Sequence, residues 1–92
     1  MSSLQSELEA LLRGSLAPVS LAVRDDSAHH AGHAGARDGA HFAVHIVSPR
    51  FAGLRMLQRH RLVYEAAAPL LPSRIHALQI HALAPEETGD SR

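Results

Sequence analysis

The sequence predicts an α+β fold, a two-layer sandwich in which helices cover one face of a three-stranded sheet. Residues 19–25 and 41–48 alternate apolar and polar side chains with the period of two that half-buried strands show. Residues 3–13 and 51–71 instead repeat apolar side chains at helical spacing. Because 92 residues with 46% hydrophobic content fit one core, a sheet covered on one side by helices is the arrangement that buries all these segments.

The first two elements are a helix and a strand. Residues 3–13 are expected to be helical because leucines recur every three or four positions, and Gly14 is placed to end the helix. These leucines are Leu4, Leu8, Leu11 and Leu12. Residues 19–25 then form a strand, followed by a loop over residues 26–39 that is rich in Ala, Gly, His and Asp.

The second strand and the helical region come next. The strand over residues 41–48 has Phe42, Val44 and Ile46 on one side and His41, Ala43 and His45 on the other. Gly53 and the basic residues 59–61 favour a short helix followed by a longer one within residues 51–71, closed by Pro72. Its apolar stripe is expected to consist of Met56, Val63, Ala67 and Leu70.

Residues 75–83 form the predicted third strand, which completes the order helix, strand, strand, helix, helix, strand. His76 shares its alternation with Leu78 and Ile80, so it is expected to lean toward the apolar side, with His81 on the other side. An acidic, polar tail over residues 86–92 is expected to be flexible. We therefore expect a single domain over residues 1–85.

Charge and hydropathy limit the classes of function. The net charge is zero and the pI is about 7.1, which argues against general attraction to nucleic-acid phosphates. Locally, however, residues 39–64 contain no acidic side chain and carry four arginines, Arg50, Arg55, Arg59 and Arg61. These form either a solvated helix face or a phosphate-binding surface. No apolar run approaches the roughly 20 residues that span a bilayer, and no signal-peptide pattern is present, so a cytoplasmic protein without membrane contact is expected.

Histidine is the side chain of this sequence that is best suited to bind a metal. Eight histidines and no cysteine offer nitrogen but no sulfur ligands, so an iron–sulfur site would need a partner to supply sulfur. His29, His30 and His33 lie within five positions of one loop, where they either chelate a metal or are simply tolerated by an exposed segment. Ser27 has no nucleophile elbow around it, and hydrolase activity is not expected.

An ordered set of short motifs resembles the BolA family over about residues 4–85. The motifs are Asp26-Ser27, residues 30–33, His41-Phe42, residues 48–51, Gly53, residues 59–64 and residues 75–78. One departure is Ala40, which precedes His41-Phe42 where the family usually has threonine or serine. The resemblance implies a class II KH-like fold with the same order of elements.

The resemblance also implies a function and its residues. His76 corresponds to the signature histidine of the family's last strand and His30 to its loop histidine, with His33 as the fallback. Together they would ligate a [2Fe–2S] cluster shared with a monothiol glutaredoxin, whose cysteine and bound glutathione supply sulfur, and the isolated chain would hold no cofactor. This predicts a non-enzymatic adaptor in iron–sulfur trafficking or iron and redox regulation.

Two alternatives to a cluster-ligating adaptor remain open. The family is also described as transcriptional regulators, and its helix-turn-helix-like segment maps here to residues 50–64, with Arg50, Arg55, Arg59 and Arg61 as phosphate contacts. A simpler alternative is a domain that binds the glutaredoxin through the arginines without ligating a cluster. The sequence does not decide between His30 and His33.

Overall fold

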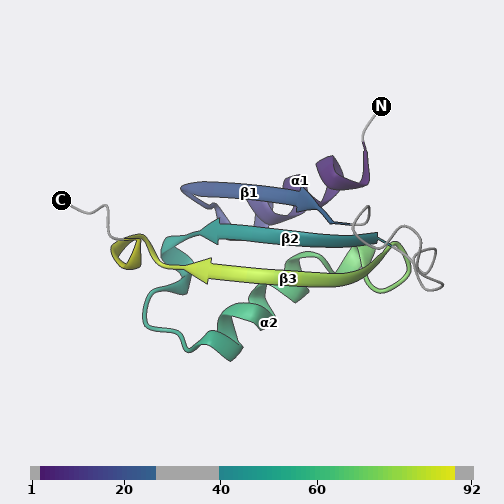
Figure 1. The fold of residues 1–92 in the computed structure, drawn as a ribbon. Coiled ribbons are helices and arrows are strands. Elements are labelled where there is room, and N and C mark those ends of the chain that lie inside the picture. The colour runs from purple at the N-terminus through teal and green to yellow at the C-terminus, as the bar shows by residue number, and fades with distance from the viewer. Residues whose placement is uncertain (1–2, 27–39, 89–92) are drawn as a thin grey trace.

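The computed structural model describes residues 3–26 and 40–88 of the chain. The predicted α+β class is confirmed, and the first helix and the three strands follow in the predicted order (Figure 1). Between the second and third strands, however, there is one α-helix and not the two that were predicted. The α-helices and strands are α1 (Leu4–Leu16), β1 (Ser20–Asp25), β2 (Ala40–Val47), α2 (Met56–Ala66) and β3 (Ile75–Leu83). Short 3₁₀ turns are η3 (Pro49–Phe51), η4 (Ala68–Leu70) and η5 (Pro85–Glu87).

The strands form one mixed sheet in the order β1-β2-β3. β1 pairs with β2 in antiparallel orientation, and β2 pairs with β3 in parallel orientation. Both helices lie on the same side of this sheet (Figure 1), against which Phe42, Val44 and Ile46 are buried. The opposite side of the sheet, called here the open face, has no helix over it in the described part of the chain. Arg24, His45 and Gln79 are exposed on this side.

Helix α1 is longer than its leucine pattern predicts. It begins after Ser3, whose side chain accepts a hydrogen bond from the Ser6 amide at 3.0 Å, and it continues through Gly14 to Leu16. The prediction that Gly14 ends the helix was wrong because Leu16 is buried in the core at 2% exposure, and this packing outweighs the low helix propensity of glycine. Ala17 caps the end of the helix in the left-handed conformation, with a φ of 43°.

Residues 51–71 do not form one continuous helix, as predicted, but they contain one α-helix, α2, and the 3₁₀ turns η3 and η4 before and after it stand in place of the predicted second helix. Fully buried Phe51 ends the turn η3, and α2 follows from Met56. Val63, Ala67 and Leu70 are buried as predicted, but Met56 is 52% exposed. The assignment of Met56 to the stripe was therefore wrong, because Met56 is the first residue of α2 and remains exposed there.

A bulge in β3 changes which side of the sheet His76 occupies. Ala40 pairs with Ile75, but the next residue of β2, His41, pairs with Ala77, so β3 has an extra residue at this point. Ile75 and Leu78 are both buried although they are three positions apart. The prediction that His76 leans toward the apolar side was therefore wrong, and His76 is exposed.

A further 3₁₀ turn lies at the predicted end of the domain, residue 85. Residues 85–87 form η5, and Thr88 donates a side-chain hydrogen bond to the Pro85 carbonyl at 2.9 Å. Residues 89–92 of the expected tail lie outside the described part. None of the helices over residues 3–26 and 40–88 is both long and apolar enough to cross a membrane.

Candidate functional site

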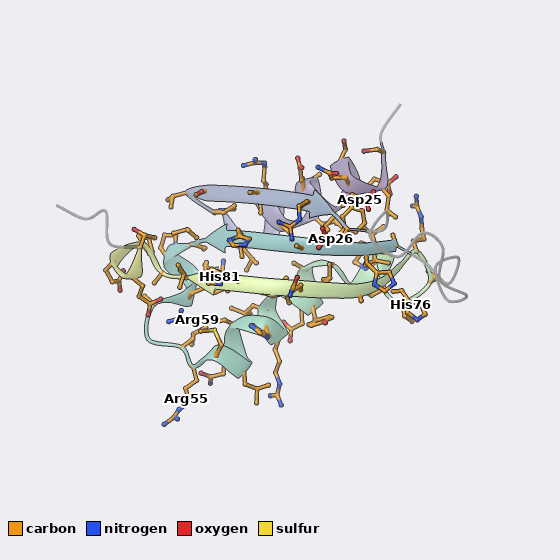
Figure 2. All side chains as sticks on the ribbon, viewed as in Figure 1. Asp25, Asp26, Arg55, Arg59, His76 and His81 are labelled. Atoms are coloured by element: carbon orange, nitrogen blue, oxygen red, sulfur yellow. The ribbon has the colours of Figure 1, made fainter. Side chains whose placement is uncertain are left out.

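His76 lies at the end of the sheet where the segment over residues 27–39 leaves and rejoins it (Figure 2). The Asp26 amide donates a hydrogen bond to the His41 carbonyl at 2.7 Å, and Ala40 pairs with Ile75, the residue before His76. Both ends of the segment are thus fixed beside His76. His29, His30 and His33 belong to this segment and lie outside the described residues.

The bulge places His76 next to His41 on the open face. Their ring centroids are 6.1 Å apart and their planes differ by 24°. Asp26, His41 and Ala77 contribute to the lining of a shallow hollow of about 300 Å³ beside this pair. An exposed imidazole beside an open hollow is accessible to a metal centre carried by another molecule.

The described residues do not form a complete metal site by themselves. Over residues 3–26 and 40–88, no group of three or more His, Asp or Glu side chains is arranged to hold an ion. The whole chain also lacks cysteine. His76 can therefore supply one nitrogen ligand, and any sulfur ligand of a cluster bound there must come from another molecule.

The four arginines of the predicted basic surface do not share one environment. Arg50, Arg55 and Arg61 are exposed, whereas Arg59 is only 5% exposed. Its guanidinium donates to the Leu54 carbonyl at 2.9 Å and to the Ala82 carbonyl at 3.1 Å. The expectation that Arg59 belongs to a solvent-facing phosphate surface was wrong, because its donors are used inside the protein.

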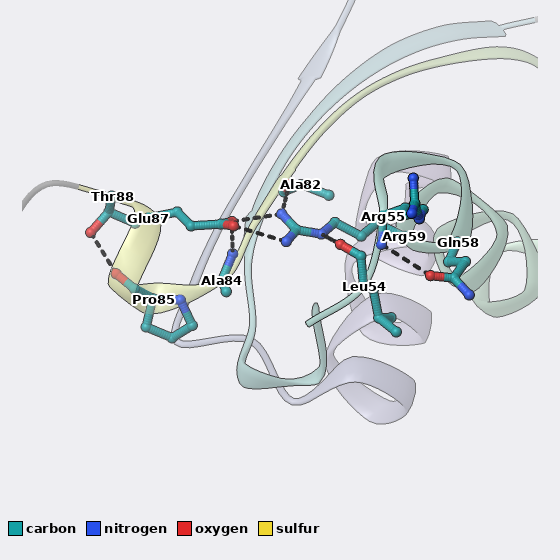
Figure 3. Close-up of polar contacts among 9 residues, drawn as sticks. All are labelled: Leu54, Arg55, Gln58, Arg59, Ala82, Ala84, Pro85, Glu87 and Thr88. Carbon is teal, nitrogen blue, oxygen red and sulfur yellow. Dashed lines mark hydrogen bonds and ion pairs between the residues drawn. The ribbon is translucent and has the colours of Figure 1, made fainter. Parts of the chain in front are cut away.

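Glu87 completes the surroundings of Arg59 (Figure 3). The two side chains form a bidentate ion pair, with Nη1–Oε1 at 2.6 Å and Nη2–Oε2 at 2.9 Å, and the Ala84 amide also donates to Glu87 at 2.8 Å. These hydrogen bonds, first of all those from Arg59, lower the pKa of Glu87 to about 2. The same pair raises the pKa of Arg59.

Sequence reasoning missed Glu87 and the proximity of His41 to His76. Glu87 lies in an acidic stretch with no periodic pattern, and its partner is 28 residues away, so no local signal marks it. His41 was correctly placed on the side opposite Phe42. Its approach to His76 depends on the bulge, which alternation alone does not reveal.

The chain is similar to known proteins in sequence and in fold. The model of the family described as BolA-like protein matches residues 12–87. The chain belongs to the BolA family. Among BolA relatives, "Protein BOLA1, chloroplastic" of Arabidopsis thaliana is 41% identical over 87 residues, which cover 90% of this chain and 54% of the relative. "DNA-binding transcriptional regulator BolA" of Escherichia coli is 39% identical over 84 residues, covering 91% of this chain and 78% of the relative.

Solved structures of BolA proteins share the architecture. BolA1 from Arabidopsis thaliana matches with a TM-score of 0.83 at 39% identity, covering 96% of this chain and 98% of that one. The BolA domain of SufE1 from the same plant matches with a TM-score of 0.82 at 40% identity, covering 95% and 98%. The chain spans only 54% to 62% of the length of the plant, mouse and orangutan BolA relatives that it matches.

Proposed function

We propose that this BolA-family chain is a non-enzymatic adaptor that binds a monothiol glutaredoxin and co-ligates a [2Fe–2S] cluster. His76 supplies one ligand and His30 the second, with His33 as the alternative loop ligand. The observation that carries the proposal is the exposure of His76, at a bulge beside both ends of the histidine-bearing segment, in a chain without cysteine.

The donor set fits a shared cluster. His30 follows Asp26 by four residues, a span of at most about 14 Å, and His33 precedes Ala40 by seven, a span of at most about 25 Å. Either histidine is therefore close, along the chain, to an end of the segment that is anchored beside His76. A bound cluster would contribute one-electron redox chemistry, at a higher potential than with thiolate ligands alone. Cysteine and glutathione of the glutaredoxin complex would provide the sulfur.

The test combines a cluster-loaded monothiol glutaredoxin with the chain and records visible circular dichroism. Wild type is expected to produce a new spectrum, and His76→Ala is expected to lose it. His81→Ala is the matched control, because His81 is also an exposed histidine of β3 and should leave the spectrum as in wild type. Separate His30→Ala and His33→Ala variants identify the loop ligand.

The possible results distinguish cluster sharing from binding of the glutaredoxin without ligation of its cluster. No new spectrum with wild type would contradict cluster sharing. A His76→Ala variant that still associates with glutaredoxin and gives the wild-type spectrum would favour a domain that binds this partner without ligating its cluster. Association is measured independently of the spectrum by size-exclusion chromatography.

A second candidate function is DNA binding. The Escherichia coli relative is named a DNA-binding transcriptional regulator, and Arg50, Arg55 and Arg61 are exposed around α2. If this function is present, Arg55→Ala and Arg61→Ala should each weaken binding and reduce the salt slope by about one. Arg13→Ala, an exposed arginine of α1, is the control. Equal binding by all three variants would contradict a role for the α2 arginines.

A further inference from the structure

The open face of the sheet carries a second pair of stacked histidines, away from His76. His45 of β2 and His81 of β3 are direct register partners, and both are exposed. Their ring centroids are 4.8 Å apart and their planes differ by 28°. His76 and His81 lie toward opposite ends of β3 (Figure 2), five residues or about 16 Å apart along the strand. The two pairs are therefore separate features.

The spacing of the His45 and His81 rings suits binding of one ion by both. Neighbouring strands lie about 4.8 Å apart, so the sheet itself holds the two imidazoles side by side. Zinc–imidazole bonds are about 2.0–2.1 Å long, so two ligand nitrogens of one ion lie at most about 4 Å apart. A modest tilt of the two rings toward each other reaches this distance. The rings of His41 and His76, at 6.1 Å across a bulge, would require a larger movement.

The surroundings of the pair leave room for further ligands. A surface hollow of about 250 Å³ borders both rings, and Gln79 also lines it. Water molecules or the amide oxygen of Gln79 can complete the coordination. Ala22, the partner of His45 on β1, has only a methyl side chain.

The charge near the pair is compatible with a cation. Arg24 lines the same hollow, but its guanidinium is paired with Asp26, with Nε–Oδ1 at 2.7 Å and Nη2–Oδ2 at 3.1 Å. This ion pair largely offsets the positive charge of Arg24. The hollow therefore presents two imidazoles without a net local charge that would exclude a divalent ion.

We propose that His45 and His81 form a two-histidine site for a divalent transition-metal ion on the open face of the sheet. Nitrogen ligands with oxygen co-ligands favour ions such as Zn²⁺, Ni²⁺ and Cu²⁺, with Cu²⁺ bound most tightly in the usual order of stabilities. The site is independent of the proposed iron–sulfur function, because it uses neither His76 nor residues 27–39.

The test is a Zn²⁺ titration of the full chain followed by NMR of the histidine side-chain nitrogens, which observes each imidazole separately. The signals of His45 and His81 are expected to shift together with a single affinity. In His45→Gln, the shift of His81 should require about 100-fold more Zn²⁺, and the converse should hold in His81→Gln, because each variant loses the chelate. His41→Gln is the matched control and should leave both signals as in wild type.

Two results would overturn the proposal. One is a wild-type titration in which His45 and His81 do not respond while other histidines do. The other is a shift of His81 that persists unchanged in His45→Gln, which would show independent binding to single imidazoles. Both substitutions affect exposed side chains, so the fold is expected to survive, and far-ultraviolet circular dichroism verifies it.

Discussion

At the residue scale, Arg59 and the nearby Arg61 show that arginines two positions apart can occupy opposite environments, one buried and one exposed. Arg59 and Arg61 lie two residues apart on α2, yet Arg61 is exposed while Arg59 is buried. The buried guanidinium joins α2 to β3 through the Ala82 carbonyl and to η5 through Glu87. Its planar array of donors suits this role better than the single ammonium group of lysine would.

Replacing Arg59 should therefore destabilise the fold. Arg59→Met is expected to cost about 2–3 kcal/mol of unfolding free energy, because the half-buried carbonyl of Leu54 and the buried carbonyl of Ala82 lose their donor. Arg61→Met should change stability little, because Arg61 is exposed. Urea unfolding of the two variants measures the difference. Equal stability of both would contradict the structural role of Arg59.

The Arg59–Glu87 pair should also make stability depend on acid. Since the pKa of Glu87 falls from its ordinary value of 4.5 to about 2 on folding, the pair contributes above about pH 4.5 and this contribution is lost as the pH falls toward 2. Glu87→Gln should thus be less stable than wild type at pH 7, and the difference should shrink between pH 4.5 and pH 2. Urea unfolding across this range tests it, with Glu86→Gln as control. A difference that stays constant with pH would count against the linkage.

At the scale of elements, the ends of strands and helices are connected by a few buried polar groups. Ser48 follows β2 and is fully buried, and its hydroxyl donates to the Leu16 carbonyl at 2.6 Å and accepts from the Arg50 amide at 3.0 Å. One side chain thus links the last turn of α1 to the start of η3. The end of α1 is thus held against the turn that follows β2.

Substitution of Ser48 tests this connection between elements. Ser48→Ala should reduce the unfolding free energy by about 1–3 kcal/mol, because the Leu16 carbonyl would remain buried without its donor. Ser20→Ala, at an exposed position of β1, is the matched control and should have little effect. Chemical denaturation of both variants measures the comparison. A Ser48→Ala variant as stable as Ser20→Ala would show that the linkage contributes nothing.

At the scale of the whole molecule, β2 organises both the core and the open face. As the central strand, it pairs with β1 on one edge and β3 on the other, so its alternating side chains contribute to the core and to both histidine pairs. The sheet thereby separates packing on one side from accessible imidazoles on the other. The turn η5 then returns the chain to α2 through Glu87.

Truncation tests whether η5 belongs to the cooperative fold. A chain ending after Ala84 should melt at least about 5 °C lower than wild type, because Arg59 would remain buried without its carboxylate. A chain ending after Thr88 keeps the ion pair and should melt near the wild-type temperature. Thermal unfolding followed by circular dichroism compares the two. Equal melting temperatures would show that η5 is dispensable.

The α+β class, the order of the strands, the two sides of β2 and the BolA family can all be predicted from the amino-acid sequence. These properties follow from local periodicity and from short motifs in order, as with Phe42, Val44 and Ile46 in the core. The exposure of His76, the burial of Arg59 and the contact between His45 and His81 are visible only in the folded chain. They depend on a strand bulge, a pairing register and an ion pair across 28 residues, which arise between segments and which no local pattern in either segment encodes.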